Sequence, residues 1–453
     1  MSERTPPCGA QPQRPSFRPR GALALAGALL LAGCGWFGED EAPPLPGERI
    51  AIMISESDAE PDPRLADLAV TLPAPYLNES WPQAGGYPDH AMHHLMAADD
   101  LEPVWRASAG YGSDDGQRVL SGPIAAAGRV YTMDRDYEIR AFSAETGQRL
   151  WSFEAEPPDE DDEAFGGGLA YADGILVVTT GFAEALALNA ATGEQIWRRQ
   201  LSGPVRAAAT VADGRVVAVS IDNQATALSL ETGEEVWRHA GFAETAGLLG
   251  SASPAISDAS VIVPYSSGEL FALRLGNGRV SWQENLTSTR RVDALSSLAD
   301  IRGRPVVDRG FVFAVSHAGR LIAIDLRSGA RAWDRRIGGT ETPWIAGDYL
   351  FLVTTDQILL AVTRDGGRVR WATPLPRFED EEDREDPISW VGPVLVKDRL
   401  LVGNNLGELW SVSPYTGEPL GRIDVGAGLR LAPIVADGTV YLQTDDGDLI
   451  AYR

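Results

Sequence analysis

Cysteine is almost absent from this chain of 453 residues: Cys8 and Cys34 are the only two, and both lie near the N-terminus. The rest of the chain therefore has no thiol with which to form a disulfide framework, hold zinc or act as a nucleophile.

Positive charge is also scarce, because 39 lysine and arginine residues stand against 64 aspartate and glutamate residues, for a net charge of −25. Nucleic acid and anionic lipid surfaces are poor partners for such a chain. Part of the acidity lies in two runs, residues 159–163 and 379–386. Both lack the alternating ligands and turn glycine of a calcium loop, so we interpret them as solvated insertions.

The chain also lacks an N-terminal apolar run of membrane-spanning length. Residues 21–31 are apolar but too few for a permanent span, and several arginines precede them. Leu31-Ala32-Gly33-Cys34 then resembles the lipobox of bacterial lipoproteins, which implies that residues 1–33 are a signal peptide and that Cys34 is lipidated. A plain secretory signal with an incidental cysteine is the alternative. Several acyl chains would anchor the protein stably, and Gly35 is compatible with sorting to the outer membrane, facing the periplasm.

Residues 34–100 are less regular, and we expect a lipidated tether followed by a lead-in segment. Residues 42–46 are rich in proline and predict a stiff tether, whereas residues 81–86 predict a packed turn. His90, His93 and His94 would share a face if they were helical, which is a spacing that suits a metal. Only Asp89 accompanies them, so we favour the interpretation without a metal.

One spacing recurs through the rest of the chain: a small residue, a glycine six positions later and a tryptophan four positions after the glycine. Six units fill this frame: Ala141, Gly147 and Trp151; Ala187, Gly193 and Trp197; Ala227, Gly233 and Trp237; Ala272, Gly278 and Trp282; Ala323, Gly329 and Trp333; Ala361, Gly367 and Trp371. In a seventh unit, Ser411 and Gly417 are followed by Gly421 in place of the tryptophan. The units are 38 to 51 residues long, the length of one four-stranded propeller blade. We expect each first glycine at positive φ in the turn between the third and fourth strands, and the tryptophans packed between blades.

The two ends of this region predict how a ring closes. Ala451 is an eighth small residue with no glycine or tryptophan after it, whereas Trp105 has the pattern of a fourth strand with no unit before it. The N-terminal strand around Trp105 would complete the last blade and leave no open sheet edge. We therefore predict an all-β fold over residues 101–453: an eight-bladed propeller with four-stranded antiparallel blades.

The blade motif resembles the repeat of pyrroloquinoline quinone (PQQ) propellers, which quinoprotein dehydrogenases and the BamB family of lipoproteins both use. The dehydrogenases resemble one another in an adjacent cysteine pair and a much longer chain, which this sequence lacks. An acidic quinone would also need a cationic clamp, and no motif shows one, although Arg290, Arg291, Arg302 and Arg304 could converge in space. We therefore expect no catalytic residues and no cofactor. A PQQ-dependent dehydrogenase and a ligand-binding envelope sensor are the alternatives.

Residues 81–86, 305–307, 311–314, 319–329 and 365–367 are similar to the BamB family almost position by position. This resemblance implies a non-enzymatic scaffold of the outer-membrane β-barrel assembly (BAM) complex. Such a scaffold binds the periplasmic POTRA domains of the barrel subunit BamA, alongside the other BAM subunits. Direct contact with outer-membrane protein substrates is left open.

The resemblance also implies two partner-binding loops. In the first, Leu248 keeps an apolar position and Leu249 replaces an arginine of the family; in the second, Asp300 matches and Arg302 reverses a charge. We expect the two leucines to form an exposed apolar knob, and Asp300 with Arg302 to orient the partner at a polar rim. Burial of both leucines under the blade is the alternative.

Overall fold

The computed structural model describes residues 57–114, 117–157, 164–242, 251–287 and 300–453. Contacts divide the chain into residues 1–55 and a compact unit of residues 56–453, so the lead-in segment from residue 56 and the strands belong to one unit. Within the described part the only helix is the 3-10 helix η1 (Pro63–Leu65), and no helix there has the length and hydropathy of a membrane span. Cys34 lies outside the described residues.

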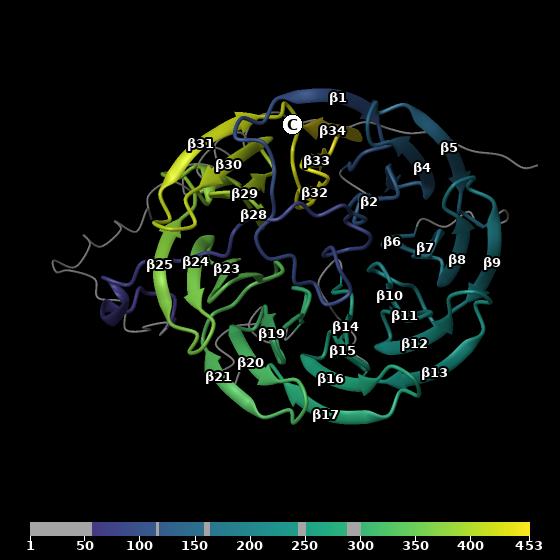
Figure 1. Cartoon of the computed structure of the whole chain (residues 1–453), viewed down its shortest axis with the longest axis horizontal. Helices are drawn as coiled ribbons and strands as arrows, with labels where there is room; N and C mark the ends of the chain where they lie inside the picture. The colour runs from purple at the N-terminus through teal and green to yellow at the C-terminus, as the bar shows by residue number, and fades with distance from the viewer. Residues whose placement is uncertain (1–56, 115–116, 158–163, 243–250, 288–299) are drawn as a thin grey trace, which may run out of the picture. The chain divides into compact units, whose positions relative to one another are not determined.

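Eight four-stranded antiparallel sheets follow one another round a ring, as predicted (Figure 1). The first four blades consist of β2 (Ile124–Ala126), β3 (Arg129–Met133), β4 (Glu138–Ser143) and β5 (Arg149–Glu154); β6 (Gly167–Ala172), β7 (Ile175–Thr180), β8 (Glu184–Asn189) and β9 (Gln195–Gln200); β10 (Thr210–Ala212), β11 (Arg215–Val219), β12 (Gln224–Ser229) and β13 (Glu235–Ala240); β14 (Ala255–Ser257), β15 (Ser260–Pro264), β16 (Glu269–Arg274) and β17 (Val280–Asn285). Blades 5 to 7 consist of β18 (Val306–Asp308), β19 (Phe311–Ser316), β20 (Arg320–Asp325) and β21 (Arg331–Arg335); β22 (Trp344–Ala346), β23 (Tyr349–Val353), β24 (Ile358–Thr363) and β25 (Val369–Pro374); β28 (Trp390–Val396), β29 (Arg399–Asn404), β30 (Glu408–Val412) and β31 (Pro419–Asp424). Between blades 6 and 7, the acidic run of residues 379–386 forms a short exposed hairpin, β26 (Phe378–Asp380) and β27 (Glu385–Pro387). The other acidic run lies outside the described residues.

The eighth blade closes the ring as predicted. It combines β32 (Ile434–Ala436), β33 (Thr439–Gln443) and β34 (Asp448–Tyr452) with β1 (Pro103–Ser108), which pairs with the outer edge of β34. Trp105 lies opposite Ala451 in this pairing, where the other blades place a tryptophan opposite their small residue. Both ends of the sheet region therefore meet in one blade, and β1 gives the eighth blade the four strands that the other blades have.

The repeated frame is a contact between neighbouring blades. Each of the seven frame glycines has φ between +63° and +78° and lies in the turn before the fourth strand. A Cβ atom on any of them would come within 2.6–2.8 Å of the tryptophan of the preceding blade. The indole nitrogen of that tryptophan donates a hydrogen bond of 2.7–3.2 Å to a carbonyl just before the glycine. The tryptophans therefore pack between blades, as predicted.

The missing tryptophan of blade 7 has a structural reason. Its neighbour, blade 8, takes its fourth strand from β1, so β34 is not followed by a turn that would present a glycine. A tryptophan at Gly421 would have no glycine to pack on, and no other atom lies within 4 Å of a Cβ placed there. The seam between blades 7 and 8 instead carries Arg106, which hydrogen bonds to the Val425 carbonyl at 3.3 Å.

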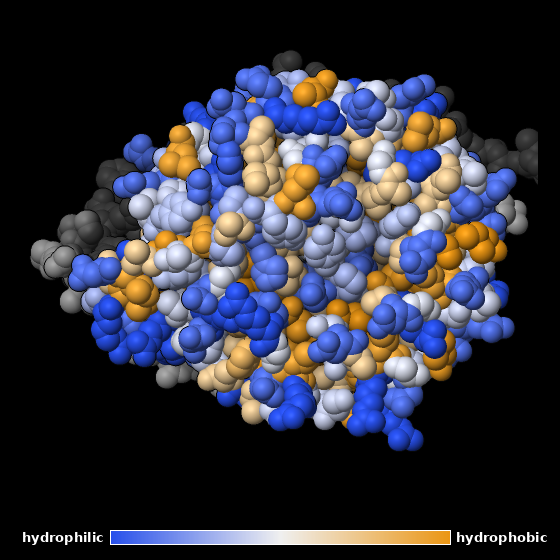
Figure 2. Space-filling view, viewed as in Figure 1, coloured by the Kyte–Doolittle hydropathy of each residue, from blue (hydrophilic) through white to orange (hydrophobic). Residues whose placement is uncertain are grey.

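The lead-in segment crosses the middle of the ring (Figure 1). We call residues 76–97 the lid, because they hydrogen bond to all eight blades, taken in the order of the ring. The bonds join Asn78 to Asp437, Trp81 to Ala125, Pro82 to Tyr171, Gln83 to Val211, Pro88 to Ile256, Asp89 to Val307, His93 to Trp344, and Leu95 to Lys397. In the space-filling view of the same side, the middle of the ring is filled with atoms (Figure 2).

The three lid histidines serve this packing rather than a common site. His90 bonds through Nδ1 to the Pro305 carbonyl at 2.7 Å, and His94 bonds to the Pro73 carbonyl at 2.6 Å. The Nε2 atom of His93 instead lies 3.8 Å from the Oδ1 atom of Asp308. Within the described ranges, no three histidine, cysteine or acidic side chains gather as metal ligands would.

Candidate functional site: the loop face and the central chamber

The two ends of the ring differ in what they carry. In a four-stranded antiparallel blade, the turns between strands one and two and between strands three and four share one end. The connections between blades and the turns between strands two and three share the other end, which we call the loop face. The lid bonds to residues at the turns between strands one and two, such as Asp437 and Lys397. The lid therefore lies at that end, and the loop face is the opposite end.

The loop face of blade 3 presents an exposed aromatic side chain. Phe242 lies two residues after the end of β13 and is 72% exposed, more than any other large hydrophobic residue in the described part of the chain. Its backbone is fixed: its N–H donates to Glu269 at 2.9 Å, and its carbonyl accepts from Asn223 at 2.6 Å. Ile221, in the turn between β11 and β12 at the same end, is 41% exposed. An exposed aromatic side chain on a fixed backbone, with an exposed aliphatic side chain at the same end of the blade, is the kind of feature that anchors protein interfaces.

The residues that the sequence suggested for partner binding fall in three different settings. Leu248 and Leu249 lie outside the described residues, in the connection that begins just after Phe242. Asp300 is 4% exposed, and its carbonyl accepts a hydrogen bond from the His317 N–H. Arg302, two residues further on, lines a chamber on the axis of the ring. Sequence reasoning missed Phe242, because nothing in its local pattern tells a buried aromatic from an exposed one.

The chamber has a volume of about 450 Å³ and draws its walls from residues of all eight blades, while Ala84 of the lid contributes at its inner end. Five arginines line it: Arg118, Arg206, Arg302, Arg304 and Arg430. Among the lining residues that the structure describes, Glu341 is the only carboxylate. This local excess of positive charge stands within a chain whose net charge is −25.

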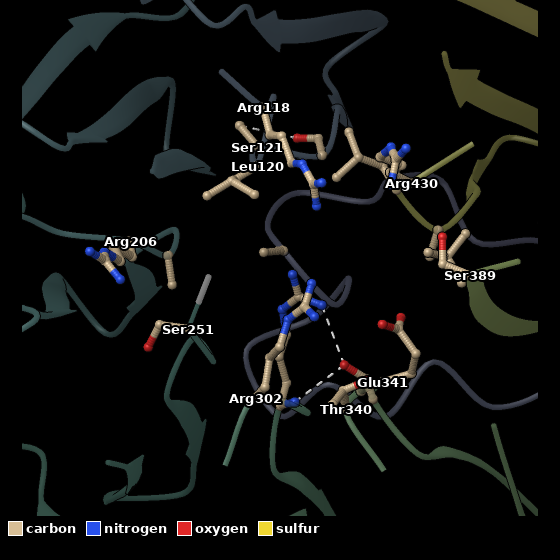
Figure 3. Close-up of a pocket in the computed structure, with 18 of the residues that line it drawn as sticks. Arg118, Leu120, Ser121, Arg206, Ser251, Arg302, Thr340, Glu341, Ser389 and Arg430 are labelled. Carbon is tan, nitrogen blue, oxygen red and sulfur yellow. Dashed lines mark hydrogen bonds between the residues drawn. The ribbon is translucent and has the colours of Figure 1, made fainter. Parts of the chain in front are cut away.

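Two of these arginines face one another across the chamber. Figure 3 shows Arg118 and Arg302 reaching inward from opposite sides, while Arg206 and Arg430 lie further from the middle. Arg430 bonds to Asp445 at 2.8 Å. By contrast, no carboxylate in the described ranges forms an ion pair with Arg118 or Arg302. Their guanidinium groups are therefore available to a ligand.

Arg304 and Glu341 are perturbed by their position inside the ring. Burial lowers the pKa of Arg304, Glu341 opposes that change, and Arg302 adds to it. Burial also raises the pKa of Glu341, against the influence of Arg302 and Arg304. Arg304 hydrogen bonds to Thr342 at 3.3 Å, and its buried Nε has no partner. The wall beside blades 5 and 6 is thus positively charged, and one of its buried donors, the Nε group of Arg304, lacks a hydrogen-bond partner.

The arginines converge although they lie far apart in the sequence. Of the four arginines that we named as able to converge, Arg302 and Arg304 do so, and Arg290 and Arg291 lie outside the described residues. The others were missed because no local motif joins them. One signal was present in the repeat: Arg206, Arg302 and Arg430 each stand four residues before the innermost strand of their blade.

The chamber does not fit a quinone held together with calcium. Calcium needs six or more oxygen ligands, several of them carboxylates, and Glu341 alone supplies one here. The two cysteines of the chain lie at residues 8 and 34, so neither belongs to a blade. The described walls of the chamber therefore carry cationic groups but not a set of calcium ligands. The blades also lack the adjacent cysteine pair in which quinoprotein dehydrogenases resemble one another.

Comparisons with known proteins agree on one family. The family model of the outer membrane protein assembly factor BamB matches residues 92–164, 157–373 and 380–453. The BamB protein of Salmonella typhimurium is 33% identical over 355 residues, covering 77% of this chain and 88% of that protein. The BamB protein of Escherichia coli is 32% identical, covering 76% of this chain and 86% of that protein.

Solved structures with the same fold are more distant in sequence. The structure of BamB from Moraxella catarrhalis superposes with a TM-score of 0.67 at 20% identity, covering 78% of this chain and all of that one. A quinohemoprotein alcohol dehydrogenase from Pseudomonas putida superposes with a TM-score of 0.64 at 14% identity, covering 85% of this chain and 83% of that one. At these identities the likeness shows the fold alone, so the family rests on the sequence matches: the chain belongs to the family of the outer membrane protein assembly factor BamB.

Proposed function

We propose that this protein is a non-catalytic scaffold for the assembly of outer-membrane β-barrel proteins, anchored to the outer membrane by lipid on Cys34 and facing the periplasm. The observation that carries the proposal is the match to BamB assembly factors, which begins at residue 92 and extends over all eight blades. A scaffold of this kind needs a rigid body with an exposed binding surface, and it needs no catalytic residue.

The proposed partner is the POTRA region of the BamA subunit, and the proposed contact is the loop face over blades 3 to 5. Phe242 supports this choice, because it is exposed on a fixed backbone at the start of the connection that contains Leu248 and Leu249. We therefore propose Phe242, Leu248 and Leu249 as the apolar centre of the interface. Arg302 lines the chamber at the same end of the ring. Asp300, two residues before it, is buried and supports the loop that carries Arg302.

The proposal is tested by titrating purified POTRA domains of the same bacterium's BamA against soluble chain that begins after Cys34. Phe242→Asp places a charge at the centre of the proposed interface without removing a buried group. We expect it to raise Kd at least tenfold, which corresponds to about 1.4 kcal/mol. Leu248→Asp should act in the same direction.

The matched control is Leu420→Asp on the outer strand β31, where the leucine is 59% exposed and away from the loop face. It should leave Kd within about twofold of the wild-type value. Equal weakening by Leu420→Asp and Phe242→Asp would show that added charge, not the loop face, controls binding. Absence of binding by the folded wild-type chain would contradict the proposed partner.

A further inference from the structure

The chamber combines features that packing of the ring does not require. Its walls hold five arginines and one glutamate, and Arg118 and Arg302 form no ion pair with any carboxylate in the described ranges. Like charges gathered in a partly enclosed space raise the free energy of the folded state, because their repulsion is poorly screened there. Charge that destabilises a fold in this way is typical of a binding site whose ligand supplies the compensation.

The arrangement of the charges indicates what kind of ligand fits. Arg118 precedes the innermost strand of blade 1, and Arg302 and Arg304 precede that of blade 5, on the opposite side of an eight-bladed ring. Their guanidinium groups approach the middle from two sides (Figure 3). Guanidinium groups bind carboxylates and phosphates in pairs of parallel hydrogen bonds. A ligand with an anionic group at each end can therefore contact both sides at once.

The shape of the chamber favours a small molecule. Its volume of about 450 Å³ lies in the range of pockets for small ligands. The lid bonds to all eight blades across one end of the axis, so a ligand has to enter from the loop face. An enclosed space of this size holds a metabolite more readily than a folded segment of a partner protein.

We propose that the chamber binds a small organic polyanion, carrying two or more carboxylate or phosphate groups, between Arg118 on one side and Arg302 with Arg304 on the other. Glu341, beside Arg304 at the wall, would accept a hydrogen bond from a hydroxyl group of the same ligand. The ligand groups face the axis, whereas the proposed apolar contact with BamA lies on blade 3, so binding of a small anion can be measured without BamA.

Isothermal titration calorimetry at constant ionic strength tests the proposal, with citrate as the polycarboxylate probe, pyrophosphate as the phosphate probe and acetate as the monovalent anion. We expect one citrate or pyrophosphate per chain, and acetate binding at least tenfold more weakly. The probe that binds more tightly identifies the chemistry of the natural ligand. Arg302→Gln and Arg118→Gln should each weaken that binding at least tenfold, because each removes one of the facing guanidinium groups.

Arg149→Gln is the matched control, since it removes the same charge from the exposed outer strand β5, away from the chamber. It should change the affinity by less than twofold.

Three results would overturn the proposal: no binding of either probe to the folded chain, binding that Arg302→Gln leaves unchanged, or equal weakening by Arg149→Gln.

Discussion

At the scale of single residues, the ring is held together by one contact used seven times, between the tryptophan of one blade and the frame glycine of the next. The contact was predictable because its members recur at fixed spacing, so the repeat itself marks them. Each glycine meets two demands at once, a positive φ and space for an indole ring. The two demands can be separated by experiment, since blade 1 has a second glycine that meets only the first.

Gly147→Ala should destabilise the protein more than Gly128→Ala. The two glycines have φ of +70° and +72°, so alanine at either position costs about 1–2 kcal/mol of backbone strain. A Cβ at residue 147 would lie 2.6 Å from Trp105, whereas a Cβ at residue 128 would have none of the surrounding atoms within 4 Å. Displacing the indole should add about 1–3 kcal/mol for Gly147→Ala alone. Urea unfolding measures both, and equal costs would show that the indole contact does not constrain the turn.

At the scale of elements, the lid is the part that the sequence described least well. Its proline-rich and glycine-rich turns were recognisable, but its function was not, because its hydrogen-bond partners are spread over all eight blades of the propeller. The three histidines illustrate the difference. Their spacing suited a metal, whereas the folded chain places two of them against separate carbonyl groups. Only the tertiary structure distinguishes these two uses of a histidine.

His90 should make the stability of the protein depend on pH. Burial lowers its pKa from 6.5 to about 3, Arg304 adds to this change, and the bond to Pro305 opposes it. Because the folded-state pKa lies below that of the unfolded chain, the folded state gains its full advantage above pH 6.5. This advantage is lost progressively as the pH falls towards 3. Between pH 7.5 and 5, the free energy of unfolding should fall by up to about 2 kcal/mol from this residue.

His90→Asn should flatten that pH dependence, because asparagine tolerates the φ of +61° and can still donate to the Pro305 carbonyl. His93→Asn, three residues away at a φ of +53°, is the matched control and should retain the slope of the wild-type protein. Urea unfolding at several pH values measures the difference. Parallel slopes for all three proteins would mean that His90 is not the group that responds to acid.

At the scale of the whole molecule, the eight blades and their closure by Trp105 were predictable. The repeat units, together with an incomplete unit at each end of the region, specify a closed ring. The chamber was predictable only in part. Arginines 118, 206, 302 and 430 line the same chamber because every blade points its first strand inward, which is a property of the closed ring and not of any local segment. The exposure of Phe242 likewise depends on what the neighbouring blades leave uncovered.

The two ends of the ring therefore differ in use. The lid ties the blades together at one end. At the other end, among the residues that the structure describes, the loop face presents the exposed side chains of Phe242 and Ile221 and the residues that line the chamber. In our account the loop face carries both the proposed partner surface and the entrance of the proposed ligand site. A scaffold built in this way can present one face to the assembly complex, while the lipid that we propose on Cys34 holds it at the membrane.

The central claim, that this protein assists the assembly of outer-membrane β-barrels through its loop face, is tested most directly in the source bacterium with the chromosomal copy deleted. The measurement is the amount of folded barrel protein in the outer membrane. We predict that deletion lowers this amount, that the wild-type chain and Leu420→Asp restore it, and that Phe242→Asp combined with Leu248→Asp does not. An unchanged amount after deletion, or full restoration by the double variant at wild-type abundance, would contradict the account.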